Sequence, residues 1–299
     1  LKVSPNFDAI SQKSSALVHQ ISTLIFNNTD LLILTFFTNL KVVSVYVMYN
    51  LIFSNIDRII GTVNNSFTFA LGQNFHEKKE KFIKFYDTYE VFFMAFVFSL
   101  FSIAFILILP FMKLYTLHID DVNYLDPILP ILFVILKLLN NARTSSNNVI
   151  FIAGHFKSTQ YRSILESTIN LFFSIVFVTF LGIYGVLLGT ICALLYRSTD
   201  MIIYANKVIL KRNPIVTFRR WLINIGVFTL IVLSNSYYSF FNLTSYTEIL
   251  IWGMLLSLVI FPIYIFIGLI FEKEVYYLSK DFCKRALIRF KRRLFKVYA

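Results

Sequence analysis

Charged residues are scarce in this sequence, at 15% of its 299 residues, whereas hydrophobic residues make up 57%. A water-soluble domain of this length has much less apolar side chain to bury in one core. The composition therefore excludes an ordinary soluble fold and indicates that a lipid bilayer is the solvent.

Cysteine and acidic residues are also few. The two cysteines, Cys192 and Cys283, have no His or Cys partner at the spacing of a metal site, which predicts two reduced thiols and neither a metal nor another cofactor. The 16 Asp and Glu residues are outnumbered by 28 Lys and Arg, so the formal net charge is +12. Such a surplus of positive charge is typical of proteins that bind either nucleic acid or an anionic membrane surface. The positions of the basic residues along the chain distinguish these two possibilities.

Long apolar runs are abundant. A membrane helix needs about 20 mostly apolar residues to cross about 30 Å of hydrocarbon. The runs here are too long and too continuously apolar for membrane strands, which alternate with a period of two. We predict an all-α, polytopic bundle of about eight transmembrane helices, at residues 15–37, 42–71, 88–111, 127–153, 159–181, 183–206, 218–240 and 247–271.

Lysine and arginine residues fall on alternate sides of this predicted bundle. They gather at the amino-terminal end, in the connections after the second, fourth and sixth windows, where we include Arg197, and in the carboxyl-terminal tail. The opposite side has only Lys41 and Lys113, and its longest loop carries Asp120 and Asp121. The positive-inside rule predicts that both chain termini lie in the cytoplasm.

The same pattern divides the chain into three parts. We assign residues 1–206 to a six-helix lobe, 207–272 to two additional transmembrane helices and 273–299 to a basic cytoplasmic tail. Aromatic and leucine residues alternate with Lys and Arg in the tail, which predicts a segment that lies on anionic lipids of the inner leaflet. The adjoining membrane helix makes nucleic-acid binding the weaker interpretation.

Polar residues recur at helical spacing along four of the windows, so that each forms a stripe on one face. A charged group inside a membrane helix costs a few kcal/mol, and such groups mark substrate or ion pathways. Single Asn or Thr residues often only join helices by hydrogen bonds, but four stripes predict a hydrated cavity lined by windows 15–37, 42–71, 127–153 and 159–181. We expect the substrate path or ion coupling to involve Asn27, Asp30, Asn50, Asp57, Arg58, Asn64, Lys137, Asn141, Arg143, Glu166 and Asn170.

The chemistry of these stripes suits a particular kind of cargo. Surfaces rich in Asn, Ser and Thr match a substrate with many hydroxyl or amide groups, such as a sugar. Lys137 and Arg143 leave two roles open, because they either meet a phosphate or uronate or pair with the acids of the stripes. We expect no catalytic residue.

Several segments resemble one family of transporters. The run from Gly154 through Asn170 and the segment Phe-Leu-Gly-Ile-Tyr-Gly-Val-Leu-Leu-Gly-Thr at 180–190 are similar to the second half of the bacterial polysaccharide transporters, the O-antigen and repeat-unit flippases. The helix with Asn28-Thr29-Asp30 resembles the helix that opens that half. These proteins belong to the multidrug/oligosaccharidyl-lipid/polysaccharide exporter superfamily, and the resemblance covers about residues 14–206.

The resemblance implies an alternating-access flippase in the bacterial plasma membrane. Its substrate would be an oligosaccharide linked to undecaprenyl pyrophosphate, moved from the inner to the outer leaflet. The family has two lobes, and only the second lobe and two trailing helices are matched here. Together with the start at Leu1, this implies a truncated or partial chain that works with a missing first lobe or as a homo-oligomer.

Two other classes compete with this interpretation, and a nonfunctional remnant of a longer gene is a further possibility. A multidrug or cation antiporter of the same superfamily would have a more apolar, aromatic-lined cavity than the Asn-rich stripes predict. A membrane enzyme of polysaccharide assembly, either a polymerase or an acyltransferase, needs catalytic acids, histidines or arginines at a substantial outer loop or membrane face. The candidates for that role are His118, Asp120 and Asp121 in a short loop, so we predict a transporter rather than an enzyme.

Overall fold

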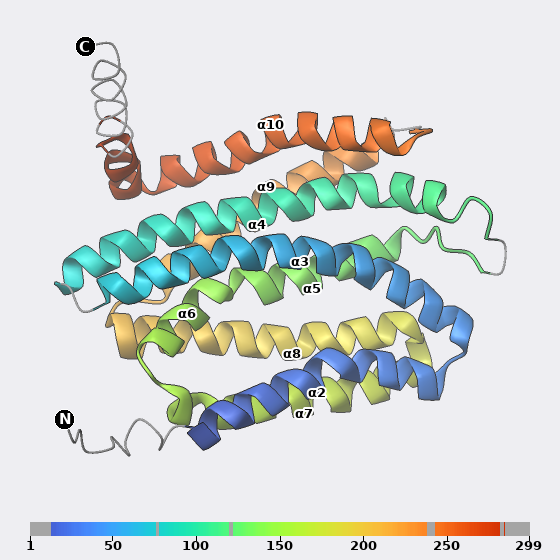
Figure 1. The fold of residues 1–299 in the computed structure, drawn as a ribbon, viewed down its shortest axis with the longest axis horizontal. Coiled ribbons are helices and arrows are strands. Elements are labelled where there is room, and N and C mark those ends of the chain that lie inside the picture. The colour runs from blue at the N-terminus through green and yellow to red at the C-terminus, as the bar shows by residue number, and fades with distance from the viewer. Residues whose placement is uncertain (1–12, 76–77, 120–121, 238–242, 282–283, 285–299) are drawn as a thin grey trace, which may run out of the picture.

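Helices make up nearly all of the structure (Figure 1), a computed structural model that describes residues 13–75, 78–119, 122–237, 243–281 and 284. No strand occurs among these residues, which confirms the predicted all-α bundle. The helices are α2 Lys13–Phe37, α3 Leu40–Asn74, α4 Lys79–Tyr115, α5 Ile128–Ala142, α6 Thr144–Ile152, α7 Phe156–Leu181, α8 Ile183–Tyr204, η1 Ala205–Leu210, α9 Ile215–Tyr237 and α10 Tyr246–Phe271.

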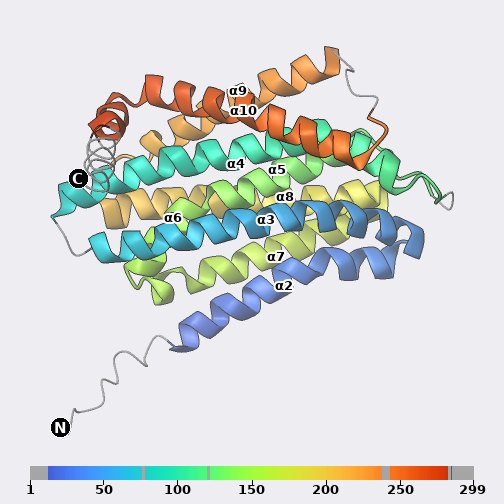
Figure 2. The same ribbon diagram turned by 45° about the horizontal axis from the view of Figure 1, so that its top comes forward.

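Six segments of the described chain are long and apolar enough to cross a membrane. They are α4, the α5–α6 pair, α7, α8 with η1, α9 and α10. α2 and α3 are long enough but less apolar, because polar side chains recur along them. Both nevertheless run alongside the other helices in two views (Figures 1 and 2), so every predicted window has a counterpart in one polytopic bundle.

The turns that carry most basic residues share one end of the bundle. The connections α3–α4, α6–α7 and η1–α9 lie there with the start of α2 and the end of α10, on the left in Figure 1. The turns α2–α3, α4–α5 and α7–α8 lie at the opposite end. The basic turns therefore share one end of the bundle, and the cytoplasmic location of that end stays a prediction of the positive-inside rule.

The window at 127–153 is broken at Arg143 rather than continuous. α5 ends and α6 begins there, and the Arg143 N–H donates to the Asn141 carbonyl instead of continuing the helical ladder. Asn141 Nδ2 donates to the Lys137 carbonyl at 3.1 Å, and polar side chains that compete for backbone groups in this way weaken a helix. The sequence 183–210 contains a second irregularity, since α8 ends in the π-helical turn η1.

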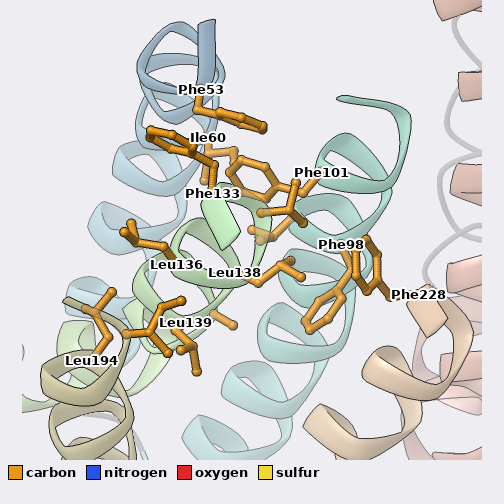
Figure 3. Packing of buried hydrophobic residues seen from close by; sticks show 14 of the residues in the cluster. Phe53, Ile60, Phe98, Phe101, Phe133, Leu136, Leu138, Leu139, Leu194 and Phe228 are labelled. Atoms are coloured by element: carbon orange, nitrogen blue, oxygen red, sulfur yellow. The ribbon is translucent and has the colours of Figure 1, made fainter. Parts of the chain in front are cut away.

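Aromatic side chains fill the centre of the bundle between α3, α4 and α5 (Figure 3). Phe53 and Phe133 stack with ring centroids 5.5 Å apart and an interplanar angle of 9°, and Phe101 lies against Phe53. All three side chains are at most 1% exposed. Within a bilayer such close packing, rather than release from water, favours association between helices.

α7 and α8 pack closely against each other at Gly185 and Gly189 of α8. Gly182 makes the turn between them, and its backbone φ angle is +56°. Residues other than glycine rarely adopt such a positive φ angle. A Cβ added at Gly185 would collide with the backbone of Phe177, and one added at Gly189 would collide with Ser174. The absence of side chains at these two positions therefore lets the helices touch.

Some sequence predictions fall on residues outside the described part. These are Asp120, Asp121, Cys283 and most of the basic tail. Cys192 is a free thiol, as predicted. α10 packs along α4, as does α9, and the division of the chain at residues 206 and 272 stays a prediction.

We expect a Gly185→Ala variant to be less stable than the natural protein, because the added methyl group pushes α7 away from α8. Overpacking of this kind costs about 1–3 kcal/mol, and the melting temperature of the purified protein in detergent measures it. Gly226→Ala on α9 is the matched control, since nothing lies within 4 Å of its added Cβ. Equal melting temperatures for the two variants would contradict the close α7–α8 contact.

The assigned orientation is tested with single cysteines in a chain whose natural cysteines are replaced by serine. Asn123 between α4 and α5 and Lys157 at the start of α7 are exposed. The α4–α5 connection and the start of α7 lie at opposite ends of the bundle (Figure 1). We expect a membrane-impermeant thiol reagent to label an Asn123→Cys variant in intact cells and a Lys157→Cys variant only after permeabilisation. The reverse pattern would invert the topology.

Candidate functional site

A cavity of about 720 Å³ lies between α2, α5, α6, α7 and α8. It is close to the basic end of the bundle, because its wall includes His19 near the start of α2 and Phe156 at the start of α7. The polar side chains of the wall are His19, Gln20, Thr23, Asn140, Arg143, Thr144, Asn147, Ser163, Glu166 and Arg197. The apolar ones include Leu24, Phe151, Phe156 and Met201.

Glu166 is the centre of the charge arrangement in this wall. Its carboxylate accepts a hydrogen bond from Arg143 Nη1 at 2.7 Å, and Arg197 Nε lies 3.3 Å from its other oxygen without the alignment of a hydrogen bond. Arg197 continues to Asp200 at 3.0 Å, and Asp200 pairs with Arg162 at 2.6 Å. Three guanidinium groups and two carboxylates thus form a chain with one surplus positive charge.

His19 connects α2 to this charged chain. Its Nε2 lies 3.1 Å from the Phe156 carbonyl, which only accepts, so Nε2 carries a hydrogen. Its Nδ1 lies 2.7 Å from Ser163 Oγ, and Arg197 Nη2 donates to the same Oγ at 3.1 Å. A neutral His19 satisfies all of these contacts, because Ser163 then accepts from Arg197 and donates to Nδ1.

A second cluster lies between α3 and α5, apart from the cavity wall. Asp57 accepts from Lys137 Nζ at 2.7 Å and from Asn141 Nδ2 at 2.5 Å. Lys137 and Asn141 are both 8% exposed. Both cations whose role the sequence left open, Lys137 and Arg143, therefore pair with acids.

Asn64 belongs to a third cluster, formed only by neutral groups. Its side-chain oxygen accepts from Tyr89 Oη at 2.7 Å and from Asn148 Nδ2 at 2.8 Å, which joins α3, α4 and α6. Hydrogen bonds of this type hold membrane helices together. A structural role is therefore sufficient for Asn64.

The remaining predicted residues are not brought into the cavity. Asp30 and Asn170 lie together at the contact of α2, α7 and α8. Asn50 accepts from Ser54 on its own helix, while Asn27 and Arg58 are exposed. The predicted cavity was lined by residues 42–71, whereas the observed cavity has α8 in its wall and no residue of α3.

Several buried titratable residues were missed or misplaced from the sequence. Arg197 was grouped with a basic connection, yet it lies within α8 and is 2% exposed. His19 and Glu90 received no role, and Glu90 is fully buried in α4, where Arg220 and Thr217 of α9 donate to it. Arg197 and Asp200 are three residues apart inside an apolar window, and this spacing of opposite charges would have indicated that Arg197 lies within a helix.

Comparisons of the chain with protein-family models, with curated proteins and with solved structures give no match. No group of three or more His, Cys, Asp or Glu residues occurs at metal-binding distance in the part of the chain that the structure describes. The fold and the cavity together define a multi-pass α-helical membrane protein with an ionised, polar site inside the bundle.

We expect Glu166→Gln to destabilise the protein, because it leaves the Arg143 and Arg197 guanidinium groups buried without their shared carboxylate. Removing one partner of a buried ion pair costs about 3–5 kcal/mol, and the loss would be measured as a lower melting temperature in detergent. Arg58→Gln serves as the control, since Arg58 is exposed and contacts Asn55 of its own helix. A Glu166→Gln variant as stable as Arg58→Gln would show that the three groups do not pair.

Proposed function

We propose that this chain is a membrane transporter that flips a lipid-linked oligosaccharide, a polysaccharide repeat unit, from the inner to the outer leaflet of a bacterial plasma membrane. The observation that supports it best is the polar cavity next to the basic end of the bundle. Its volume of about 720 Å³ falls within the range of about 300–1,000 Å³ that is common for ligand pockets.

The lining of the cavity matches the chemistry of a sugar. Gln20, Asn140 and Asn147 offer amide groups, and Thr23 and Thr144 offer hydroxyl groups. Each of these side chains can exchange hydrogen bonds with sugar hydroxyls. The surplus positive charge of the Glu166 chain additionally favours an anionic group such as a phosphate.

The position of the cavity suits a substrate with a lipid tail. α2 forms one edge of the bundle (Figures 1 and 2), and Gln20 and Thr23, which line the cavity, are exposed on it. Leu24 beside them is 63% exposed. A sugar head group entering beside α2 would leave its hydrocarbon chain in the bilayer.

We further propose that the substrate is transported without chemical conversion. The helices of this chain would assemble with a partner to form a complete transporter. The partner is either a first lobe of the resembled family or a second copy, as the resemblance implies. Anionic inner-leaflet lipids are the proposed partner of the basic tail. Both proposals rest on sequence, since they concern groups outside the described residues.

The test uses purified protein in vesicles that contain a fluorescent lipid-linked oligosaccharide, with a membrane-impermeant quencher added outside. We expect the protein to increase the rate at which label becomes accessible. A Gln20→Leu, Asn147→Leu double variant should reduce the rate by about 30-fold, because two hydrogen-bonding groups are worth roughly 1 kcal/mol each. Asn65→Leu, on the exposed face of α3, should leave the rate unchanged.

Deletion of the gene provides the corresponding test in cells. Lipid-linked oligosaccharide should accumulate on the cytoplasmic leaflet, and the natural chain should restore its export better than the double variant. Movement of a lipophilic cation but not of the oligosaccharide in the vesicles would favour the antiporter instead. Unchanged leaflets after deletion would contradict the flippase.

A further inference from the structure

One aromatic side chain in the wall of the cavity, that of Phe151, is only partly covered by protein. Phe151 is 37% exposed, whereas the preceding Val149 and Ile150 of α6 are buried. Packing within the bundle therefore accounts for only part of this ring. Aromatic side chains at the wall of a pocket are common contact surfaces for ligands.

The orientation of the Phe151 ring is fixed by two neighbouring rings. His19 and Phe156 lie with their ring centroids 6.1 Å and 5.0 Å from that of Phe151. Their planes are inclined to the Phe151 ring by 62° and 58°. Among the described residues no aromatic ring stacks in parallel on Phe151, so the place of a stacked ligand is not taken.

Hydrogen-bonding groups lie next to this ring on the same helix face. Thr144, Asn147 and Phe151 follow one another at intervals of three and four residues along α6, and all three line the cavity. In the described part of the chain the side chains of Thr144 and Asn147 make no hydrogen bond. The same is true of Gln20, which lines the cavity from α2. These groups are therefore available to a ligand.

A ring beside unpaired amide groups distinguishes between the ligands that suit a polar cavity. A phosphate has no apolar face to lie on an aromatic ring. An organic cation is attracted to such a ring, but the surplus positive charge of the Glu166 chain repels it. A pyranose sugar has both a face of C–H groups and a rim of hydroxyl groups.

We propose that Phe151 is the platform on which one hexopyranose ring of the substrate stacks, and that Asn147 and Gln20 bind the hydroxyl groups at its rim. The face of an aromatic ring carries partial negative charge, which attracts the weakly positive hydrogens of C–H groups. Amide groups both donate and accept hydrogen bonds, as sugar hydroxyl groups do. The inference rests on the proposed carbohydrate substrate and names the part of it that enters this cavity.

Stacking of this kind selects the configuration of the sugar. In a β-glucopyranoside the oxygen substituents of the ring are equatorial, so three axial ring hydrogens form one flat C–H face. In an α-glucopyranoside the oxygen at the anomeric carbon is axial and projects from that face. We therefore expect the site to prefer the β anomer.

The test measures saturation-transfer NMR of methyl β-glucopyranoside with the purified full chain in lipid nanodiscs, prepared without glycoside detergents. Methyl α-glucopyranoside is the matched ligand, and we expect the natural protein to bind it about fivefold more weakly. Phe151→Leu should weaken binding of the β anomer by a similar factor of about five, because it removes the ring. Phe151→Tyr keeps the ring and should bind as the natural protein does.

Phe172→Leu is the matched control, since Phe172 is 61% exposed on α7 and does not line the cavity. Folding of each variant is checked by its elution profile and helical circular dichroism. The comparison of the two anomers on the natural protein provides a test even where Phe151→Leu fails to fold.

Equal binding of the two anomers by the natural protein, or binding of neither, would overturn the inference. Equal affinity of Phe151→Leu and Phe172→Leu for the β anomer would also overturn it, as would a lipophilic cation that binds at Phe151 in place of the glycosides. Oligosaccharide movement in vesicles that is as fast with Phe151→Leu as with the natural protein would contradict the platform and leave the flippase intact. Binding of the β anomer without oligosaccharide movement would leave the platform intact and contradict the flippase.

Discussion

Pairing of buried charge is the constraint on which the rest of this bundle depends. Inside a bilayer an ion has no water to solvate it, so a guanidinium or carboxylate requires a partner from a neighbouring helix. Glu166 between Arg143 and Arg197 joins α5, α7 and α8, and Asp57 with Lys137 joins α3 to α5. Since lipid gives apolar helices little reason to prefer one neighbour over another, these contacts decide which faces meet.

The buried polar groups of α2, α7 and α8 form two regions that differ in charge. Near the basic end the Glu166 chain contains more guanidinium groups than carboxylates, so it favours an anionic ligand in the cavity. Nearer the other end Asp30 is buried, and it accepts hydrogen bonds from Thr190 and Tyr46. α2 borders both regions, and hydrogen bonds at His19 and Asp30 connect it to α7.

Much of the fold followed from local properties of the sequence. Eight apolar windows marked the helices, and the alternation of Lys and Arg located the shared end of their turns. Polar residues three or four apart marked inward faces only in part, since Asn27 and Arg58 are exposed. The break at Arg143 was not foreseen, because it arises from competition between polar side chains and the helical ladder. The position of Arg197 was misjudged for a different reason, because its buried partner Glu166 is on another helix.

By itself the sequence determined that this protein is an all-helical membrane bundle with its basic turns at one end, since apolar content and periodicity depend only on residues close along the chain. The tertiary structure decided which polar residues meet. It placed Arg143, Glu166 and Arg197 in one cavity wall, paired Asp57 with Lys137, and brought Asp30 of α2 beside Asn170 of α7 and Thr190 of α8. The physical reason is that ion pairs and close contacts between helices, such as the one that Gly189 permits, join residues far apart in sequence.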